Sequence, residues 1–266
     1  MRTKNGLTPK KSLGQNFLVD QNIARKIVAA LNLQPDDTVI EIGPGHGALT
    51  ELLVPKVKKY IGIELDDELA SRLNKKYNDT AHFQLIHEDA LNVDFTKIPD
   101  INTPVKLVGN IPYHITSSLI FNVIEQRRLF TSMTLMIQLE VAERIVALSG
   151  SKDYGILSVL SQTFSSPKKL FSVSRNVFFP KPKVTSAVIQ WNFPGSTEYE
   201  IDDEKAYMRL VKVVFQQRRK MLRTSLKRIV PEKMNDIPID LSRRPEDLSI
   251  REFLELYRAV QKLAKF

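Results

Sequence analysis

The chain has 266 residues, a formal net charge of +9 and no cysteine. This length supports one large domain, or one domain with a smaller appendage. The lack of cysteine excludes disulfides, cysteine-ligated zinc and a thiol nucleophile. The four histidines lack metal-ligand spacing, so we expect no metal. The positive charge favours a polyanionic partner such as nucleic acid, although solvated lysines alone can produce it.

The hydropathy pattern indicates where in the cell the protein is expected. No apolar run is long enough for a membrane-spanning helix, and the basic N-terminus lacks an apolar signal core. We therefore expect a cytoplasmic protein without a membrane partner. Nothing in the sequence demands more than a monomer.

Between Thr38 and Phe193, short β-branched runs alternate with segments of helical periodicity, a pattern typical of a mostly parallel α/β sheet. The strands expected first along the chain cover 38–43, 60–65, 83–89, 105–110 and 133–140. Two later runs, 169–174 and 186–193, have no long crossover helix between them, which predicts an antiparallel pair at the sheet edge. The count favours a Rossmann-like sheet of about seven strands. An ordinary doubly wound hydrolase or dehydrogenase is the alternative.

After Phe193 the sequence changes character. Residues 194–203 are typical of a linker, and 249–264 carries an apolar stripe at helical spacing. We therefore predict a Rossmann-like domain over residues 1–193 and a small all-helical domain over 194–266.

The second predicted domain contains a basic tract, residues 215–228. The cations that recur at helical spacing here are Arg209, Lys212, Arg219, Arg223 and Lys227. No acidic residue interrupts residues 205–228, which favours contact with RNA phosphates over a merely solvated helix face. The RNA-binding candidates are Arg218, Arg219, Lys220 and Arg223. Some of these arginines are alternatively expected to hold the two domains together.

The first motif that carries chemistry is EIGPGHGALT, residues 41–50, which follows a predicted strand and opens a predicted helix. Gly43 and Gly45 let the backbone approach a ligand closely, and Glu64 ends the next strand, where a carboxylate can accept both ribose hydroxyls of an adenosine-containing cofactor. The loop alone does not separate a dinucleotide from S-adenosylmethionine. Asp89 follows the third strand, where it can bind a cofactor adenine or simply cap a turn.

The second motif is NIPY, residues 110–113, at the end of the fourth strand. Adenine N6 is a poor nucleophile because its lone pair is delocalised into the ring. The Asn110 side-chain oxygen and the Ile111 carbonyl could hold its hydrogens, while Pro112 fixes the backbone and Tyr113 offers a stacking face. The alternative is an Asn-Pro turn with a partly buried tyrosine.

A third motif, FFPKPKV, covers residues 178–184. Its prolines hold an extended loop, and Phe178 or Phe179 could form the other wall of a base-stacking slot. For Phe179 we favour a core position before the edge strand.

The ordered set of motifs resembles the KsgA family of small-subunit (16S) ribosomal RNA adenine N6,N6-dimethyltransferases, nearly end to end. The segments that carry the resemblance are KKSLGQNFL (10–18), EIGPGHGALT, IELD (63–66), EDAL (88–91), NIPY, EVAERI (140–145), VFFPKPKVTSAV (177–188), FQQRRKMLRTSL (215–226) and RRPEDLSIREF (243–253). Two departures are Thr185, where an acid is expected, and KMLRTSL, where KTLRNNL is commoner.

The resemblance implies dimethylation of two adjacent adenosines near the 3′ end of small-subunit RNA during ribosome biogenesis, with S-adenosylmethionine as cofactor. The implied cofactor contacts are Asn16, Leu18, Gly43, Glu64, Asp89 and Asn110. The implied target-base positions are Asn110, Ile111, Pro112, Tyr113 and Phe178. The rival interpretations are a large-subunit RNA methyltransferase of the macrolide-resistance type, a DNA adenine methyltransferase, and a non-catalytic RNA-binding factor on the same scaffold.

Overall fold

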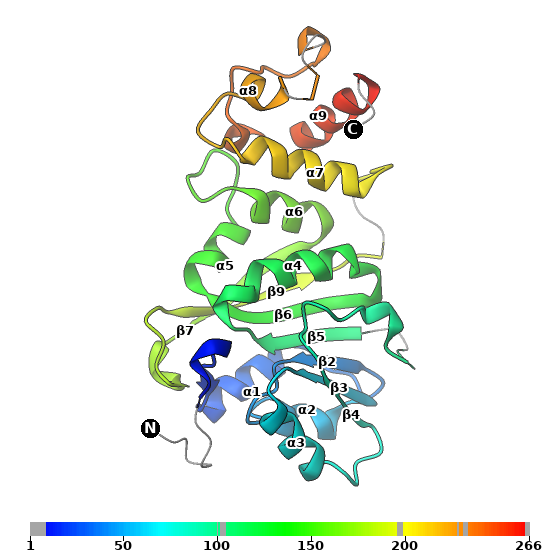
Figure 1. The fold of residues 1–266 in the computed structure, drawn as a ribbon, viewed down its shortest axis with the longest axis vertical. Helices are drawn as coiled ribbons and strands as arrows, with labels where there is room; N and C mark the ends of the chain where they lie inside the picture. Colours follow the sequence, from blue (N-terminus) through cyan, green and yellow to red (C-terminus); the bar gives the residue numbers. More distant parts are fainter. Residues whose placement is uncertain are drawn as a thin grey trace. The chain divides into compact units, whose positions relative to one another are not determined.

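The structure, a computed structural model, describes residues 9–99, 101, 105–195, 199–227, 229–230 and 234–263. It divides into two compact units (Figure 1). The first unit comprises the chain up to Ala142 together with Lys168–Gly195, and the second comprises Glu143–Pro167 together with the chain from Ser196. Among the described residues, no helix is long and apolar enough to cross a membrane.

The first unit contains, within the described residues, a seven-stranded sheet of order β4-β3-β2-β5-β6-β9-β7. Its strands are β2 (Thr38–Ile42), β3 (Lys59–Glu64), β4 (Phe83–His87), β5 (Val105–Asn110), β6 (Phe130–Gln138), β7 (Ser166–Val173) and β9 (Ser186–Asn192). Strands β2 to β6 pair in parallel, and β9 runs antiparallel to β6, with β7 beside it at the edge. Each predicted strand is therefore present, and the predicted Rossmann-like α/β class is confirmed.

The helices are named here in chain order. They are α1 (Gln21–Ala30), α2 (Thr50–Leu53), α3 (Asp67–Lys76), α4 (Thr116–Glu125), α5 (Leu139–Ile145), α6 (Ile156–Phe164), α7 (Glu204–Phe215), α8 (Leu222–Leu226) and α9 (Ile250–Leu263). Asp20 and Asp66 begin α1 and α3, because each side chain accepts hydrogen bonds from two backbone N–H groups of the first turn.

The central strands β2, β3 and β5 are largely buried on both faces, which explains why they are rich in apolar residues, whereas the edge strands β4 and β7 are partly exposed. One face presents Val39, Tyr60 and Val108 to a core completed by α1 and α2. Helix α4 covers the opposite face in Figure 1. Full burial of one such aliphatic side chain stabilises the fold by about 1.5–3 kcal/mol. Because the paired strands are parallel, the ends of β2, β3, β4 and β5 meet at one edge of the sheet.

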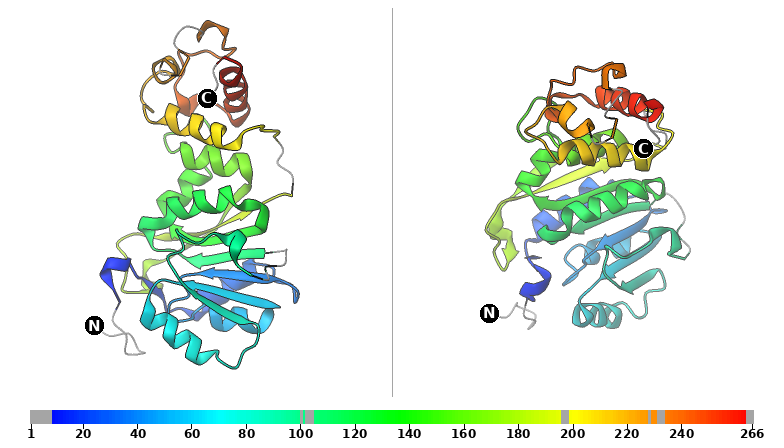
Figure 2. Two further views of the ribbon diagram at one scale, coloured as in Figure 1. Left: turned by 45° about the vertical axis from the view of Figure 1, so that its right-hand side comes forward. Right: turned by 45° about the horizontal axis from the view of Figure 1, so that its top comes forward.

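A second, two-stranded sheet joins distant parts of the chain. Strand β1 (Phe17–Leu18) pairs antiparallel with β8 (Phe178–Phe179), so that Phe17 lies opposite Phe179 and Leu18 opposite Phe178. The N-terminal segment and the segment after β7 lie side by side as a result (Figures 1 and 2). Neither short strand was predicted.

The second unit is helical, with an aromatic core between α6, α7 and α9. Tyr207 meets Phe164 and Tyr257 edge to face, and its hydroxyl lies 3.0 Å from Thr163 Oγ1. The prediction placed residues 143–167 in the first domain, but the structure groups them with the second unit because α6 packs on α7 and α9. Residues 196–198 of the predicted linker lie outside the described residues.

The basic tract does not form one continuous helix, so the predicted positive stripe at helical spacing is wrong. Helix α7 ends at Phe215 and α8 begins only at Leu222. Between them Arg218 donates from Nε to Glu246 at 2.7 Å and also hydrogen-bonds the Lys152 carbonyl. These bonds hold the chain in a turn where the prediction had a helix.

Candidate active site

A cavity of about 140 Å³ opens at the edge of the sheet where β2, β3, β4 and β5 end. Residues of four predicted motifs and of the N-terminal segment line it together. The predicted residues among them are Asn16, Gly43, Gly45, Glu64, Asp89, Asn110, Ile111, Pro112 and Tyr113. Sequence separation between these groups is large, and the parallel order of the strands brings them together.

The glycine loop forms the floor of this cavity. Gly43 and Gly45 have φ angles of 64° and 60°, in the left-handed region that favours glycine. A Cβ on Gly45 would also lie 3.2 Å from the Phe17 ring. The prediction that this motif opens a helix is confirmed, because α2 begins at Thr50, its last residue. The positive φ angles of the two glycines therefore let a ligand approach the backbone of the loop closely.

Glu64 ends β3 with its side chain 6% exposed at the cavity wall. Its two carboxylate oxygens accept hydrogen bonds of 2.9 Å from the backbone N–H groups of Gly45 and Asp66. Burial raises the pKa of this carboxyl, while the backbone donors oppose that shift. A carboxylate has about four acceptor positions, so these backbone bonds leave acceptor capacity for a ligand hydroxyl.

Asp89 lies half-buried after β4 and fills the capping role that the sequence offered. Its Oδ1 caps a turn by accepting from the Leu91 N–H at 2.9 Å, and the residue also lines the cavity. The capping bond fixes the carboxylate beside the cavity and leaves its second oxygen available for a ligand.

Asn110 is oriented by the N-terminal segment. Its Nδ2 donates to the Asn16 carbonyl at 2.9 Å, which assigns Oδ1 as the free acceptor of the side chain. Ile111 donates its backbone N–H to the Met136 carbonyl at 3.2 Å. Within the described part of the chain, no donor occupies the Asn110 Oδ1 or the Ile111 carbonyl. Two free acceptors therefore stand next to each other at the end of β5.

Tyr113 follows at the same edge, half-buried. Its hydroxyl lies 2.8 Å from Ser186 Oγ at the start of β9, a bond that fixes the orientation of the ring. Burial raises the pKa of this phenol, so it is neutral at physiological pH. The arrangement suits an aromatic wall better than a proton acceptor.

The structure does not bring two of the predicted residues to the cavity. Leu18 and Phe178 lie opposite each other in the β1–β8 pair, and both are buried in the apolar cluster under the sheet. Side chains alternate along a strand, so Phe179 lies on the same side as Phe17, which lines the cavity. The preference for Phe179 as the core residue is therefore wrong in this structure.

The sequence prediction missed several other residues of the cavity wall. They include Leu13, Gly14, Gln15, Phe17 and His114. Their motifs show neither periodicity nor paired chemical groups, and only the resemblance to a known family drew attention to the N-terminal segment.

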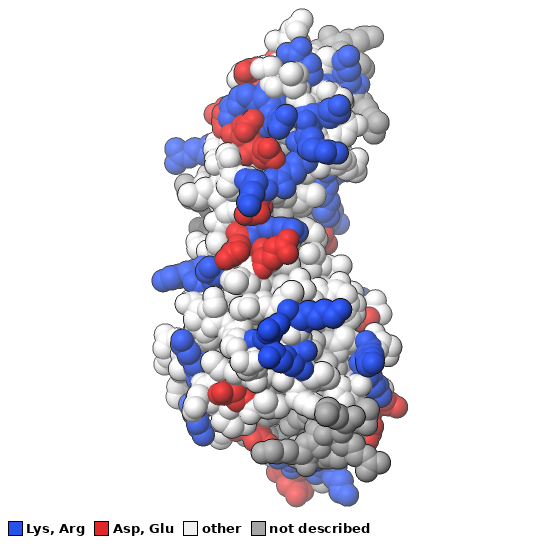
Figure 3. All heavy atoms as spheres, turned by 90° about the vertical axis from the view of Figure 1, so that its left-hand side faces the viewer, with Lys and Arg blue, Asp and Glu red and all other residues white. Residues whose placement is uncertain are grey.

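The predicted RNA-binding residues lie in the second unit. Arg219, Lys220 and Arg223 are exposed, whereas Arg218 is bound to Glu246 as described above. Figure 3 shows lysines and arginines gathered over this unit, with carboxylates among them. Three of the four predicted cations are therefore available to a polyanion.

The fold and the cavity together define a class of protein. The parallel sheet with β9 inserted antiparallel, the glycine loop after β2 and the carboxylate at the end of β3 are those of Rossmann-like, S-adenosylmethionine-dependent methyltransferases. The model of one family, ribosomal RNA adenine dimethylase, matches residues 6–262. The chain belongs to this family, and the predicted family and enzyme activity, ribosomal RNA adenine dimethylation, are confirmed.

Individual relatives agree with this assignment. Ribosomal RNA small subunit methyltransferase A of Chlorobium chlorochromatii is 44% identical over 255 residues, which cover 95% of this chain and 94% of the relative. The protein of the same name from Clostridium perfringens is 42% identical over 258 residues, which cover 95% and 90%.

Two solved structures are similar over almost the whole chain. A dimethyladenosine transferase from Plasmodium falciparum has a TM-score of 0.80 and 27% identity, and covers 94% of this chain and 100% of its own. The 23S rRNA methyltransferase ErmE has a TM-score of 0.68 and 26% identity, with coverage of 92% and 100%.

Proposed function

We propose that the chain transfers methyl groups from S-adenosylmethionine to N6 of two adjacent adenosines in the 3′-terminal hairpin of small-subunit (16S) ribosomal RNA. The product is N6,N6-dimethyladenosine, formed during ribosome biogenesis. The observation that carries the proposal is the pair of free acceptors, Asn110 Oδ1 and the Ile111 carbonyl, beside the cavity. The named relatives support the small subunit as the substrate.

The cavity fits the cofactor. Glu64 has acceptor capacity left for ribose hydroxyls, and Asp89 has a carboxylate oxygen left for an adenine amine. Gly43 and Gly45 leave room for close approach of the ligand to the backbone. We assign Asn16 to the same site, because it lines the cavity and its carbonyl orients Asn110.

The adenine amine needs to be made nucleophilic, and the chain does this through acceptors. S-adenosylmethionine, when bound, supplies an electrophilic methyl on a sulfonium. Asn110 Oδ1 and the Ile111 carbonyl accept the two N6 hydrogens and draw the nitrogen lone pair out of the ring. Tyr113 stacks on the extruded base, and Pro112 fixes the backbone between these groups. The nitrogen then has the position and the geometry for direct transfer.

No strong base is required of the chain. After one methyl has been added, the positively charged nitrogen loses a proton readily to water. The second transfer needs the same acceptors with one hydrogen left on N6, so the slot has to admit a methyl group beside Asn110. For the second wall of the slot we take Phe179, which lies on the Phe17 side of the β1–β8 pair, in place of Phe178 of the family pattern, which is buried.

We assign RNA phosphate contact to Arg219, Lys220 and Arg223, which are exposed and uninterrupted by acidic residues. Arg218 instead supports the turn that carries them, through its bonds to Glu246 and Lys152. In this assignment the second unit supplies affinity for RNA and the first unit supplies the chemistry.

The similarity to ErmE favours a second candidate, methylation of large-subunit RNA. The test is transfer of labelled methyl from S-adenosylmethionine to unmethylated small subunits, large subunits and duplex DNA, followed by nucleoside analysis. Dimethyladenosine in small-subunit RNA alone supports the proposal. Label in large-subunit RNA supports the second candidate, and RNA binding without transfer supports a non-catalytic factor.

A further inference from the structure

The N-terminal segment Lys10–Phe17 forms one wall of the cavity, and we call it the strap. Its residues 13–17 all line the cavity. The C-terminal end of the strap is fixed by the β1–β8 pair and by the bond from Asn110 Nδ2 to the Asn16 carbonyl. A ligand that fills the cavity therefore contacts the strap.

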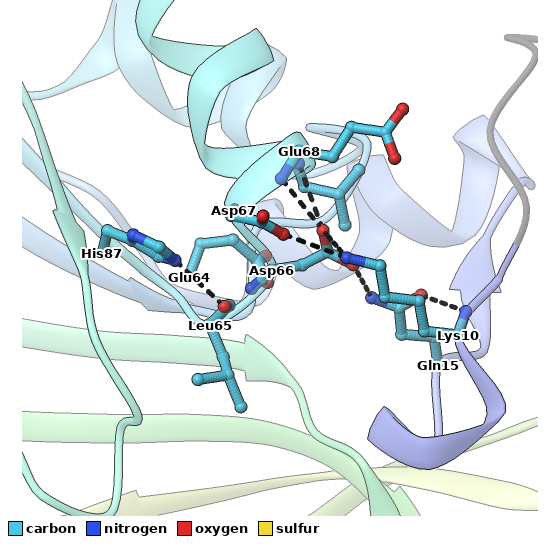
Figure 4. A network of polar contacts seen from close by, with 9 residues as sticks. Lys10, Gln15, Glu64, Leu65, Asp66, Asp67, Glu68 and His87 are labelled. Carbon is cyan, nitrogen blue, oxygen red and sulfur yellow. Dashed lines mark hydrogen bonds and ion pairs between the residues drawn. The ribbon is translucent and has the colours of Figure 1, made fainter.

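The other end of the strap is fixed by side chains (Figure 4). Lys10 Nζ donates to Asp66 Oδ1 at 2.8 Å and to Asp67 Oδ1 at 3.0 Å. Gln15 Nε2 donates to Asp66 Oδ2 at 2.8 Å, and Gln15 Oε1 accepts from the Lys10 backbone N–H at 2.8 Å. Both oxygens of Asp66 are thus bound by the strap.

Asp66 connects the strap to the cofactor-binding turn. Its backbone N–H donates to Glu64 Oε1 at 2.9 Å, and its own Oδ1 caps α3 by accepting from the Glu68 N–H at 3.1 Å. The strap is therefore anchored on the same turn that holds the proposed ribose-binding carboxylate. Movement of the strap and the position of Glu64 are linked through one residue.

The anchor differs from an ordinary surface ion pair, which contributes little, because one of its carboxylates is buried. The Asp66 side chain is only 3% exposed, although that of Lys10 is 40% exposed. Burial raises the pKa of Asp66, but the hydrogen bonds from Lys10, Gln15 and the Leu69 N–H outweigh it, and the net pKa is lowered. A buried carboxylate whose charge is satisfied by the strap loses much of that stabilisation when the strap lifts.

We infer that Lys10 is a positioning residue, which with Gln15 and Asp66 forms a latch that holds the strap over bound cofactor. The inference rests on the proposed function, since it takes the cavity as the cofactor site. The latch opens when the strap lifts to exchange product cofactor for substrate cofactor. Weakening it shortens the residence time of the ligand.

The test measures the dissociation rate of S-adenosylhomocysteine by stopped flow, with its Kd from calorimetry, in the full chain. Lys10→Met removes the cation and keeps the length of the side chain, and Lys10→Arg restores the cation. Lys11→Met is the matched control, because Lys11 is the adjacent exposed lysine of the strap. We expect Lys10→Met to dissociate roughly five- to tenfold faster, with Lys10→Arg and Lys11→Met within about twofold of the wild type.

The melting temperature of the ligand-free protein separates the latch from a general structural role. Asp66 keeps its hydrogen bonds from Gln15 and from the Glu68 N–H in Lys10→Met, so the latch predicts a modest fall in melting temperature that Lys10→Arg reverses, while dissociation accelerates. An unchanged dissociation rate in Lys10→Met, with normal binding by the wild type, overturns the latch alone. Equal acceleration in Lys11→Met also overturns it. Failure of the wild-type chain to bind S-adenosylhomocysteine overturns the proposed function instead.

Discussion

Replacement of Asn110 by alanine separates the chemical role of this side chain from its structural role. The substitution removes the free Oδ1, which we assign to the target amine, and also the Nδ2 that donates to the Asn16 carbonyl. Loss of one preorganised polar group that acts in the transition state costs about 10²- to 10³-fold in kcat. Loss of the Asn16 bond costs about 0.5–1.5 kcal/mol, which is at most about tenfold in cofactor affinity.

The expected result for Asn110→Ala is therefore a fall of at least about 100-fold in methyl transfer, with S-adenosylhomocysteine bound at most about tenfold more weakly. Single-turnover transfer to small subunits and calorimetry measure the two quantities. Asn110→Asp is the matched variant, because it keeps acceptors but places a carboxylate oxygen against the Asn16 carbonyl. We expect it to weaken cofactor binding more than alanine does.

Two results would refute this reasoning. Transfer by Asn110→Ala within about threefold of the wild type would remove Asn110 from the target amine. A loss of transfer that saturating cofactor restores would show that the side chain acts only through the strap.

The remaining predictions concern the cofactor site, the core and the basic turn. Glu64→Ala should weaken S-adenosylhomocysteine binding by at least about tenfold in calorimetry, since it removes the proposed ribose acceptors; unchanged affinity would contradict the assignment. Gly45→Ala should lower both melting temperature and cofactor affinity, because a side chain at φ 60° is strained and its Cβ meets the aromatic wall of the cavity. Burial raises the pKa of Glu41 to about 7 against hydrogen bonds that lower it. The folded chain favours the neutral Glu41 carboxyl, and this contribution to the free energy of unfolding is present in full below about pH 4.5 and is lost as pH rises through about 7. Glu41→Gln should therefore flatten the fall in urea-unfolding free energy between about pH 5 and pH 8. Joint substitution of Arg219 and Lys220 by alanine should weaken RNA binding and reduce its salt dependence without changing cofactor affinity; an unchanged salt slope would contradict phosphate contact.

The centre of the sheet could be predicted from the sequence because β2, β3 and β5 are largely buried on both faces. Runs such as 38–43 and 105–110 are rich in β-branched and aliphatic residues, each with a single charged residue, and end in glycine or asparagine. Parallel pairing then places the ends of neighbouring strands together, which was enough to group Glu64, Asp89 and Asn110 before the structure was known.

The parts that could not be predicted depend on contacts distant in sequence. The β1–β8 pair joins two-residue strands, too short to show periodicity, so the sequence could not show that Phe178 faces the core. The local sequence of the basic tract predicts one continuous helix. The turn between α7 and α8 is explained only by the bonds of Arg218 to Glu246 and Lys152, which are distant in sequence. The latch likewise depends on Lys10 meeting Asp66, and neither residue stands out in its own segment.

The central claim is that the target amine lies between two acceptors at the end of β5. The most direct measurement is a structure of the chain with S-adenosylhomocysteine and an RNA hairpin that contains the two adjacent adenosines. The account predicts that N6 of one adenine lies within hydrogen-bonding distance of Asn110 Oδ1 and the Ile111 carbonyl, with the base on the Tyr113 ring. An adenine bound elsewhere, or cofactor outside the cavity next to Glu64, would contradict it.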